Sequence, residues 1–236
     1  SLAITMRTPG NDEELVTGFL YSEGIISTLQ DIEKTESFGP TTENYQLKNR
    51  FRVYLKSSQQ LDIKRFQRHF FTNSSCGICG KSSLKALEML RKPQLDQQKN
   101  IYPAELLTRL AETLRKHQQQ FSLTGGLHAV ALFDPEGNLL AMAEDIGRHN
   151  AMDKLIGALL LEEKLPCTQG IVMVSGRASF ELVQKALMSN LPGFIAVGAP
   201  SSLAVDLARQ NNMTLLGFMK RNSFNCYSGE WRIVNS

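Results

Sequence analysis

The stretch GIVMVSGRASFELVQKALMSNLPGFIAVGA (170–199) decides the fold, because it reads as a strand, a helix and a second strand. Its outer runs, 170–175 and 193–199, are short and continuously apolar, which is typical of strands buried on both faces. Between them, residues 179–189 carry apolar side chains at helical spacing. Short apolar strands that alternate with helices predict an α/β sheet covered by helices on both faces.

The same alternation continues on both sides of this stretch. The sequence predicts helices at 103–118, 148–164 and 202–211, a hairpin of strands at 128–133 and 139–145 with its turn at 134–138, and a strand at 213–219. The resulting order, αββαβαβαβ, resembles the cytidine deaminase fold.

Cytidine deaminases hold a catalytic zinc through residues at two helix starts, and the second of these supplies two cysteines. The corresponding stretches here are EDIGRHNAMDK (144–154) and SGRASFE (175–181), and the second contains no cysteine. His149 alone cannot hold a catalytic zinc, which needs three protein ligands. We therefore expect a three-layer, cytidine-deaminase-like α/β domain that lacks the zinc ligands.

The first hundred residues have a different pattern. They predict a helix at 12–22 with Asp12 as its cap, a strand at 45–58 and a short helix at 82–92. The polar stretch PQLDQQKN (93–100) is typical of a linker. We therefore expect two domains: a small α+β domain over residues 1–97, ending in a cysteine loop and its helix, and the α/β domain over residues 98–236.

The composition is that of an ordinary globular protein. Apolar residues make up 42% of the 236 residues, and the net charge of +3 permits an anionic small ligand without demanding nucleic acid. Four cysteines are too few for a disulfide scaffold, no apolar run approaches a membrane span, and no segment resembles a signal peptide. We expect a cytoplasmic protein without a membrane partner.

The loop TNSSCGICGKSSL (72–84) holds Cys76 and Cys79 in a C-x-x-C arrangement. One interpretation is a structural zinc site. Such a site needs two further ligands, normally a second pair at similar spacing, whereas Cys167 and Cys226 are single and far apart. This absence of a second pair weakens the zinc interpretation.

Three other interpretations of the loop are also open. A thioredoxin-type redox pair belongs at a helix start after a buried strand, but residues 64–71 are too basic for such a strand. A phosphate-binding loop needs a first glycine where this chain has Ser75. A plain exposed loop without function also fits the glycines and serines.

A sulfur-handling thiol is the remaining interpretation. The thiolate is the nucleophilic form of cysteine, and Cys76 and Cys79 precede a predicted helix start, whose partial positive charge favours anions. Lys81 and Lys85 add positive charge. A persulfide on Cys76 could be carried to an acceptor, with Cys79 assisting or resolving it.

Several stretches, in order along nearly the whole chain, resemble the FdhD family of sulfur carriers required for formate dehydrogenase activity. The matching stretches are TGFLYSEGII (17–26), CGICG (76–80), LTGGLHAVALF (123–133), EDIGRHNAMDKLIG (144–157), VSGRASFELVQKA (174–186) and LAVDLARQNNMTLLGFMKRNSFNCYS (203–228). Each is weak alone, and their ordered combination is strong.

The resemblance implies a sulfur relay. The family takes sulfur from a cysteine desulfurase as a persulfide, here on Cys76, and passes it to the molybdenum cofactor before formate dehydrogenase receives that cofactor. The cofactor, in its bis-guanine-dinucleotide form, is a bound substrate, and no protein-bound metal is expected. The implied partners are the desulfurase and formate dehydrogenase, and a homodimer is compatible with the family.

The resemblance also implies that the cofactor binds the segment after the last predicted strand. In this chain the segment consists of Phe218, Met219, Lys220, Arg221, Asn222 and Ser223. Family members often carry an arginine at the position of Ser223, and Arg221 can supply that charge here. Asp145 or Glu144 could accept hydrogen bonds from the guanine.

Physical chemistry extends this second site to neighbouring strand ends. Ser175 and Arg177 follow a strand and open a helix, and Arg148 and His149 open the preceding helix; such helix starts are natural positions for binding anions. His128 opens a strand of the hairpin. Because ligands of α/β sheets bind outside the carboxyl ends of the strands, we expect these side chains to contribute to cofactor binding.

Structural roles compete with each of these assignments. Arg148, Asp153 and Lys154 could be surface charges of a helix, His128 a structural histidine, and Phe218 a core residue. The alternative function is a non-catalytic escort that binds the cofactor while the C-x-x-C pair is structural or incidental.

Overall fold

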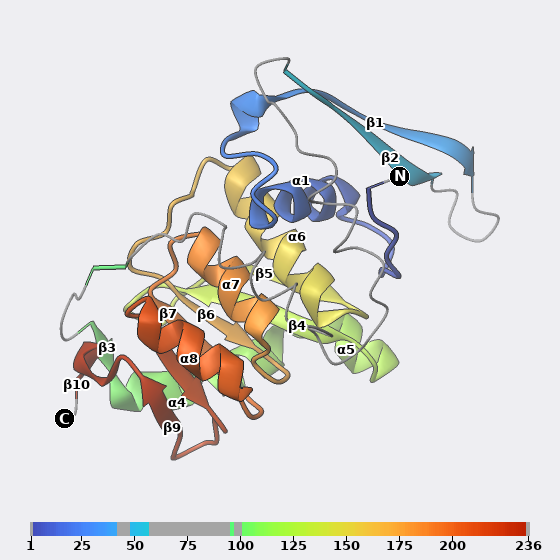
Figure 1. The fold of residues 1–236 in the computed structure, drawn as a ribbon. Helices are drawn as coiled ribbons and strands as arrows, with labels where there is room; N and C mark the ends of the chain where they lie inside the picture. Colours follow the sequence, from blue (N-terminus) through green and yellow to red (C-terminus); the bar gives the residue numbers. More distant parts are fainter. Residues whose placement is uncertain (1, 42–47, 57–94, 97–100, 235–236) are drawn as a thin grey trace.

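The computed structural model describes residues 2–41, 48–56, 95–96 and 101–234. These residues form a mixed α/β fold in which a six-stranded sheet lies among helices, while a two-stranded hairpin extends away from it (Figure 1). The helices are α1 (Asp12–Ser22), α4 (Ala104–His117), α5 (Gln119–Thr124), α6 (Arg148–Leu161), α7 (Phe180–Met188) and α8 (Ser202–Gln210). The strands are β1 (Ile32–Thr41), β2 (Lys48–Leu55), β3 (Tyr102–Pro103), β4 (His128–Phe133), β5 (Leu139–Asp145), β6 (Ile171–Val174), β7 (Gly193–Ala196), β8 (Thr214–Gly217), β9 (Asn225–Ser228) and β10 (Ile233–Val234).

The order of strands in the main sheet is β5-β4-β6-β7-β8-β9. Strands β6, β7 and β8 are parallel because α7 and α8 connect them by crossovers. Strand β4 is antiparallel to β5 and β6, and β9 is antiparallel to β8. The first residue of β4 and the last residue of β5 therefore lie at the same end of the sheet as the carboxyl ends of β6, β7 and β8.

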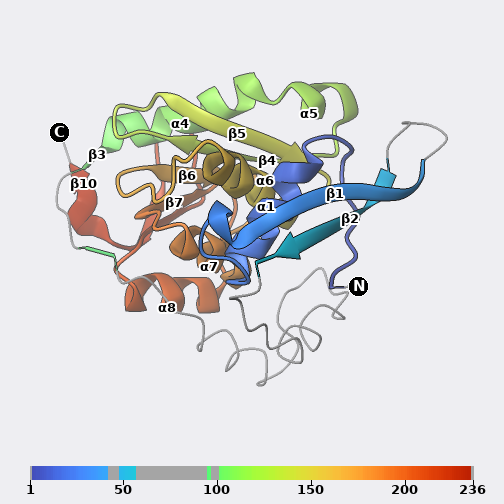
Figure 2. The same ribbon diagram turned by 90° about the horizontal axis from the view of Figure 1, so that it is seen from above.

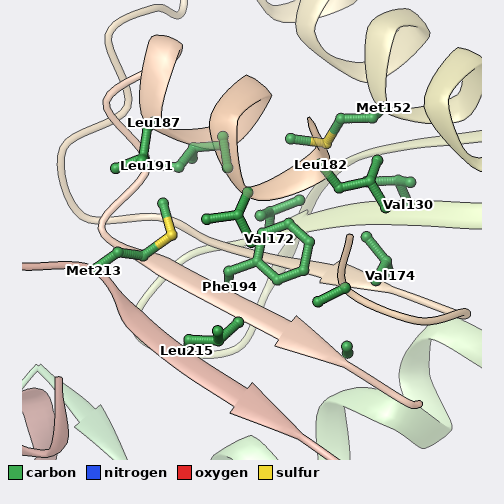
Figure 3. Close-up of a cluster of buried hydrophobic side chains, with 14 of the residues drawn as sticks. Val130, Met152, Val172, Val174, Leu182, Leu187, Leu191, Phe194, Met213 and Leu215 are labelled. Atoms are coloured by element: carbon green, nitrogen blue, oxygen red, sulfur yellow. The ribbon is translucent and has the colours of Figure 1, made fainter. Parts of the chain in front are cut away.

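Alternate residues of the central strands pack on opposite faces of the sheet, as the pleat requires. Val172 and Val174 belong to the larger core cluster and lie beneath α7 (Figure 3). Helices α6 and α8 also contribute residues to this cluster. Ile171 and Met173 belong to a second cluster, with the apolar side of α4. Figure 2 shows α4 on one side of the sheet and α7 and α8 on the other.

Helix α1 packs on α6 at a point where both helices carry glycine. A Cβ atom on Gly18 would overlap the backbone carbonyl of Asp153, and one on Gly157 would overlap the backbone of Glu14. The two backbones are therefore in direct contact, which only residues without a side chain allow.

A buried ion pair joins these two helices to α7. The Nζ atom of Lys185 lies 2.8 and 3.1 Å from the carboxylate oxygens of Asp153 and 3.2 Å from Oε1 of Glu23. Burial alone would lower the pKa of Lys185, but the two carboxylates outweigh it and raise that pKa. The interpretation of Asp153 as a surface charge is wrong, since its side chain is buried between the helices.

Every helix and strand predicted between residues 103 and 219 is present, so the mixed α/β class is confirmed. The likeness to cytidine deaminases in particular stays a prediction. Helix α5 and strands β3, β9 and β10 were not predicted, because they are short and carry no clear periodicity.

The amino-terminal half agrees less closely. Helix α1 has the predicted bounds, but its cap residue is Asn11, with a left-handed φ of 55°, rather than Asp12. Strand β1 was not predicted, because its sequence, IEKTESFGPT, is charged and contains Gly and Pro. The predicted strand at 45–58 corresponds to β2, and the predicted helix at 82–92 lies outside the described residues.

The expected linker contains a residue of the core. Leu95 is only 8% exposed and belongs to the larger core cluster, because residues 95–96 pass beside the start of β8. The boundary between domains at residue 97 stays a prediction. Among the helices that the structure describes, none combines the length and the apolar character that crossing a membrane requires.

The contact between α1 and α6 can be tested by replacing Gly157 with alanine. We expect Gly157→Ala to lower the free energy of unfolding by about 1–3 kcal/mol, because the new methyl group must push the two backbones apart. Urea denaturation of the purified protein measures this change. Gly126→Ala is the matched control, since a Cβ at exposed Gly126 meets only one atom, at 4.0 Å. Equal stability of both variants would contradict the contact.

Candidate functional site

The loops after the parallel strands are joined by backbone hydrogen bonds that continue the sheet beyond its strands. The Ser175 amide donates to the Ala129 carbonyl at 2.9 Å, and the Gly198 amide donates to the Gly176 carbonyl at 2.9 Å. The Phe218 amide then donates to the Gly198 carbonyl at 3.0 Å. These bonds join the segments around residues 129, 175–176, 198 and 218, and the charge of Arg148 acts on His128 next to Ala129. We call residues 128, 148, 175–179, 197–200 and 218–223, at this end of the sheet, the strand-end site.

The segment 218–223 is a tight connection between β8 and β9. Phe218 has a left-handed φ of 51° and is 44% exposed, an unusual conformation for a bulky residue. Met219 points the other way and is 4% exposed in the core cluster under α4. The Lys220 amide donates to the Ser223 carbonyl at 2.8 Å, which closes the turn. The segment thus exposes the Phe218 ring, while the buried side chain of Met219 fixes the segment to the core.

Positive side chains lie in the turn that holds Phe218 and in the loop after β6. Lys220 and Arg221 are exposed in the turn, and so are Asn222 and Ser223. Arg177 is exposed in the loop after β6. These cations lie at the end of the sheet where the sequence predicted a ligand rich in phosphate, so their arrangement suits an anion.

Small residues let the loops of the site approach one another. A Cβ on Gly198 would lie 3.0 Å from Cγ of Arg177 and 3.3 Å from the Gly176 carbonyl oxygen. The Oγ atom of Ser175 accepts from the Ala129 amide at 3.0 Å, so this hydroxyl also helps to hold the loop. Ser175 therefore has a structural role whether or not it contacts a ligand.

The start of α6 is positioned by the buried carboxylate of Asp145. Its Oδ1 accepts from the Gly147 amide at 2.9 Å and from Nδ2 of Asn150 at 3.0 Å. Its Oδ2 accepts from the Thr8 amide at 3.0 Å and lies 2.8 Å from Nζ of Lys154. The interpretation of Lys154 as a surface charge is therefore wrong, since its side chain is only 4% exposed.

The two acidic residues proposed to recognise guanine are already engaged. Asp145 is fully buried and both of its oxygens have protein donors, so its predicted contact with guanine is wrong. Glu144 accepts from the amides of Gln120 and Phe121, each at 2.9 Å, and thereby caps the start of α5. The sequence placed both residues at this end of the sheet, but it gave no sign of the protein groups that donate hydrogen bonds to them.

Two half-buried histidines lie beside the start of α6. Burial, and after it the charge of Arg148, lowers the pKa of His128. Burial is also the largest cause that lowers the pKa of His149 to about 4, followed by the charges of Lys185 and Arg148. Both imidazoles are therefore neutral at pH 7, and Arg148 carries the positive charge at this helix start.

The arrangement around His149 is not that of a hydrolase triad. Its Nε2 lies 3.3 Å from Oγ of Ser179 and 3.9 Å from Oε2 of Glu181. In a triad the serine and the acid contact opposite nitrogens of the ring, whereas here both face the same nitrogen. Ser179 also caps α7, since its Oγ accepts from the Leu182 amide at 3.5 Å. This histidine therefore supports the loop rather than activating the serine.

The predicted site residues thus divide into two groups. The strand-end site contains all of those that were assigned to cofactor binding: His128, Arg148, Ser175, Arg177, Phe218, Met219, Lys220, Arg221, Asn222 and Ser223. Met219 is buried, so unlike its neighbours it is not open to direct contact with a ligand. Cys76 and Cys79 lie outside the described residues.

His149 lies in EDIGRH (144–149), directly after Arg148, where the sequence places an anion-binding helix start. The structure puts its ring close to Arg148 and His128. Within the described part of the chain, no three His, Cys, Asp or Glu side chains come together as metal ligands would.

The geometry defines an α/β protein with a cationic, aromatic site at the carboxyl ends of its parallel strands. A family model matches residues 1–234, and the chain belongs to the FdhD/NarQ family.

Similar curated proteins carry one name. A protein named sulfur carrier protein FdhD from Streptomyces avermitilis is 45% identical over 235 residues, which cover 99% of this chain and 83% of that protein. Proteins of the same name from Sulfurisphaera tokodaii and Mycobacterium tuberculosis are each 42% identical. They match 99% of this chain and 85% and 86% of their own lengths.

A solved structure shares the fold. It is described as that of a formate dehydrogenase accessory protein from Desulfotalea psychrophila, and it matches with a TM-score of 0.71. The match covers 98% of this chain and 83% of that chain at 23% sequence identity.

The neutral state of His149 predicts how stability depends on pH. Its pKa rises from about 4 in the folded protein to its ordinary value of 6.5 on unfolding, so stability is lost as pH falls from 6.5 towards 4. Because the ring is partly exposed, we expect His149 to account for only about 1 kcal/mol of this loss. Urea denaturation at pH 7 and pH 4.5 should show a smaller loss for His149→Gln than for the unaltered protein; equal losses would contradict this assignment.

Proposed function

We propose that this protein is a sulfur carrier that serves formate dehydrogenase. The observation that carries the proposal is its similarity, over 99% of its length, to proteins named sulfur carrier protein FdhD. The formate dehydrogenase accessory protein with the same fold points to the same recipient enzyme.

Sulfur is carried as a persulfide on Cys76. The Cys76 thiolate attacks the outer sulfur of a persulfide on a cysteine desulfurase. The sulfur–sulfur bond of the donor breaks, the desulfurase leaves as a thiolate, and a persulfide forms on Cys76 without net oxidation or reduction. Cys79 assists or resolves this persulfide.

The acceptor is the molybdenum cofactor in its bis-guanine-dinucleotide form, bound as a substrate at the strand-end site. Arg177, Lys220 and Arg221 meet its phosphates, and Arg148 adds charge at the start of α6. The exposed ring of Phe218 offers a surface on which a guanine base stacks. Delivery breaks the sulfur–sulfur bond and restores the Cys76 thiolate, and the cofactor supplies the two electrons that convert the transferred sulfur to sulfide.

The role of Cys76 is tested by mass spectrometry after incubation with a cysteine desulfurase and cysteine. We expect an adduct of about 32 Da, one sulfur atom, that is lost in Cys76→Ala. The adduct persists in the control Cys226→Ala, which removes an exposed cysteine. In cells without the native protein, Cys76→Ala should fail to restore formate dehydrogenase activity. Full restoration would instead favour the escort function, in which the cysteines are incidental.

The strand-end site is tested by the binding of guanosine diphosphate, measured by calorimetry. Each of Arg177→Ala, Lys220→Ala and Arg221→Ala should weaken binding about tenfold if it removes one charged contact to phosphate. Lys164→Ala is the matched control, because Lys164 is exposed beyond the opposite end of α6. Unchanged affinity in all three variants would move the binding site elsewhere.

A further inference from the structure

Strands β1 and β2 form a separate two-stranded hairpin that projects from the body of the protein (Figure 1). The side chains that pack against a core cluster, Ile32, Val53 and Leu55, belong to its base, where they lie beside α1 and the end of α6. Figure 2 shows the rest of the hairpin extending past α1. Because two strands alone are only marginally stable in water, a hairpin that extends beyond its support favours a role in contacts with another molecule.

The side chains on one face of this hairpin form a defined set. Residues 34, 36 and 38 of β1 lie opposite residues 54, 52 and 50 of β2, and alternate residues of a strand point to the same side. We call this set the ladder face: Lys34, Glu36, Phe38, Arg50, Arg52 and Tyr54. It is open to solvent, since the side chains of Lys34 and Arg52 are 61% and 52% exposed.

The side chains of the ladder face are held in a row by contacts with one another. Nζ of Lys34 lies 2.9 Å from Oε2 of Glu36. Oε1 of Glu36 accepts hydrogen bonds from the Tyr54 hydroxyl at 2.9 Å and from Nη1 of Arg52 at 3.3 Å. The Arg52 guanidinium lies 4.4 Å from the centre of the Phe38 ring. The row is therefore ordered before any partner arrives, which lowers the entropy cost of binding.

The chemistry of the ladder face suits an acidic protein surface. Its three cations and one anion give a net charge of +2, out of +3 for the entire chain. Exposed cations steer the approach of a negatively charged partner, and arginine and aromatic residues are enriched in protein–protein interfaces. A nucleic acid or a lipid surface fits less well, because Glu36 repels phosphates in the middle of the row and Arg52 covers the Phe38 ring.

The proposed sulfur relay has two protein partners, and they require different surfaces. Formate dehydrogenase receives the cofactor, so it must approach the strand-end site that binds the cofactor. The desulfurase loads Cys76, which is not a residue of that site. Because the ladder face shares no residue with the strand-end site, it is the surface suited to the donor of sulfur.

We propose that the ladder face is the docking surface for the cysteine desulfurase, which meets it with an acidic surface. This inference rests on the proposed function and names the surface used in its first step. Attraction between the two charged surfaces brings the proteins together, after which the Cys76 thiolate takes the outer sulfur of the donor persulfide as described above. Electrostatic steering of this kind raises association rates by about 10- to 1,000-fold, and salt screens it.

The test reverses two charges in the double variant Arg50→Glu with Arg52→Glu, which changes the net charge of the ladder face from +2 to −2. Loading is measured as the growth of the sulfur adduct on Cys76, at a desulfurase concentration low enough for the rate to be proportional to it. We expect loading to be at least about tenfold slower at about 20 mM salt, with a smaller difference at about 500 mM. The neutral double variant Arg50→Gln with Arg52→Gln should lie between the reversed variant and the unaltered protein.

The matched control makes the same change of charge elsewhere, in Arg115→Glu with Lys116→Glu. These two residues are exposed in the last turn of α4, on the face of the main sheet opposite α7 and α8 (Figure 2). This control should be loaded by the desulfurase as fast as the unaltered protein.

A second control replaces the desulfurase with inorganic polysulfide. The Cys76 thiolate takes the outer sulfur of the polysulfide, which leaves one sulfur shorter. Because this small donor needs no docking surface, it should load the ladder-face variants at the unaltered rate. Urea denaturation shows whether each variant is folded, and if the reversed variant is not, the neutral variant decides alone.

The proposal is overturned if the desulfurase loads the folded ladder-face variants at the unaltered rate, or if the α4 control slows as much as they do. It is also overturned if loading by polysulfide slows in parallel, because the hairpin would then act on Cys76 and not on docking. Normal loading with weakened binding of formate dehydrogenase would assign the face to the recipient instead. A failure of the proposed function looks different, because the desulfurase then forms no adduct even on the unaltered protein.

Discussion

The hydrogen bonds and ion pair of the buried Asp145 carboxylate hold together the end of the sheet at which the strand-end site lies. Asp145 is the last residue of β5. Its carboxylate accepts a hydrogen bond from the Gly147 amide in the turn into α6, pairs with Lys154 on that helix and accepts a hydrogen bond from the Thr8 amide. Removing one partner from a buried pair of this kind costs about 3–5 kcal/mol, because the remaining charge stays buried. Hence the amino-terminal stretch, the start of α6 and the hairpin of β4 and β5 keep one arrangement.

The direction of Arg148 follows from this arrangement. Since Asp145 holds the first turn of α6 in place, the side chains of Arg148 and His149 project from that turn at a fixed position beside His128. Burial lowers the pKa of both imidazoles, that of His149 to about 4, so the positive charge at this helix start at pH 7 comes from Arg148. The charge at this helix start is therefore carried by a guanidinium, which does not titrate near neutral pH.

The sequence revealed those parts of the fold that local pattern determines. The apolar runs at 171–174 and 193–196 could only be buried strands, and the helices between them followed from their spacing. Strand β1 escaped notice because its partner, β2, and not its own composition, makes it a strand. Arg177 was assigned to the site from its place after a strand, and Phe218 from the resemblance to the FdhD family. The hydrogen bond between Asp145 and Thr8 joins residues far apart in sequence and carries no local signal.

The turn between β8 and β9 has a thermodynamic consequence. Backbone bonds from Phe218 and Lys220 and the buried side chain of Met219 hold its conformation before any ligand arrives. Fixing a residue's backbone on binding costs about 1–2 kcal/mol of conformational entropy. In this turn folding already meets much of that entropy cost, so any molecule that bound here would lose little affinity to ordering the backbone. The left-handed backbone at Phe218 is thus a strain that folding itself sustains, and it leaves the exposed ring held in one place.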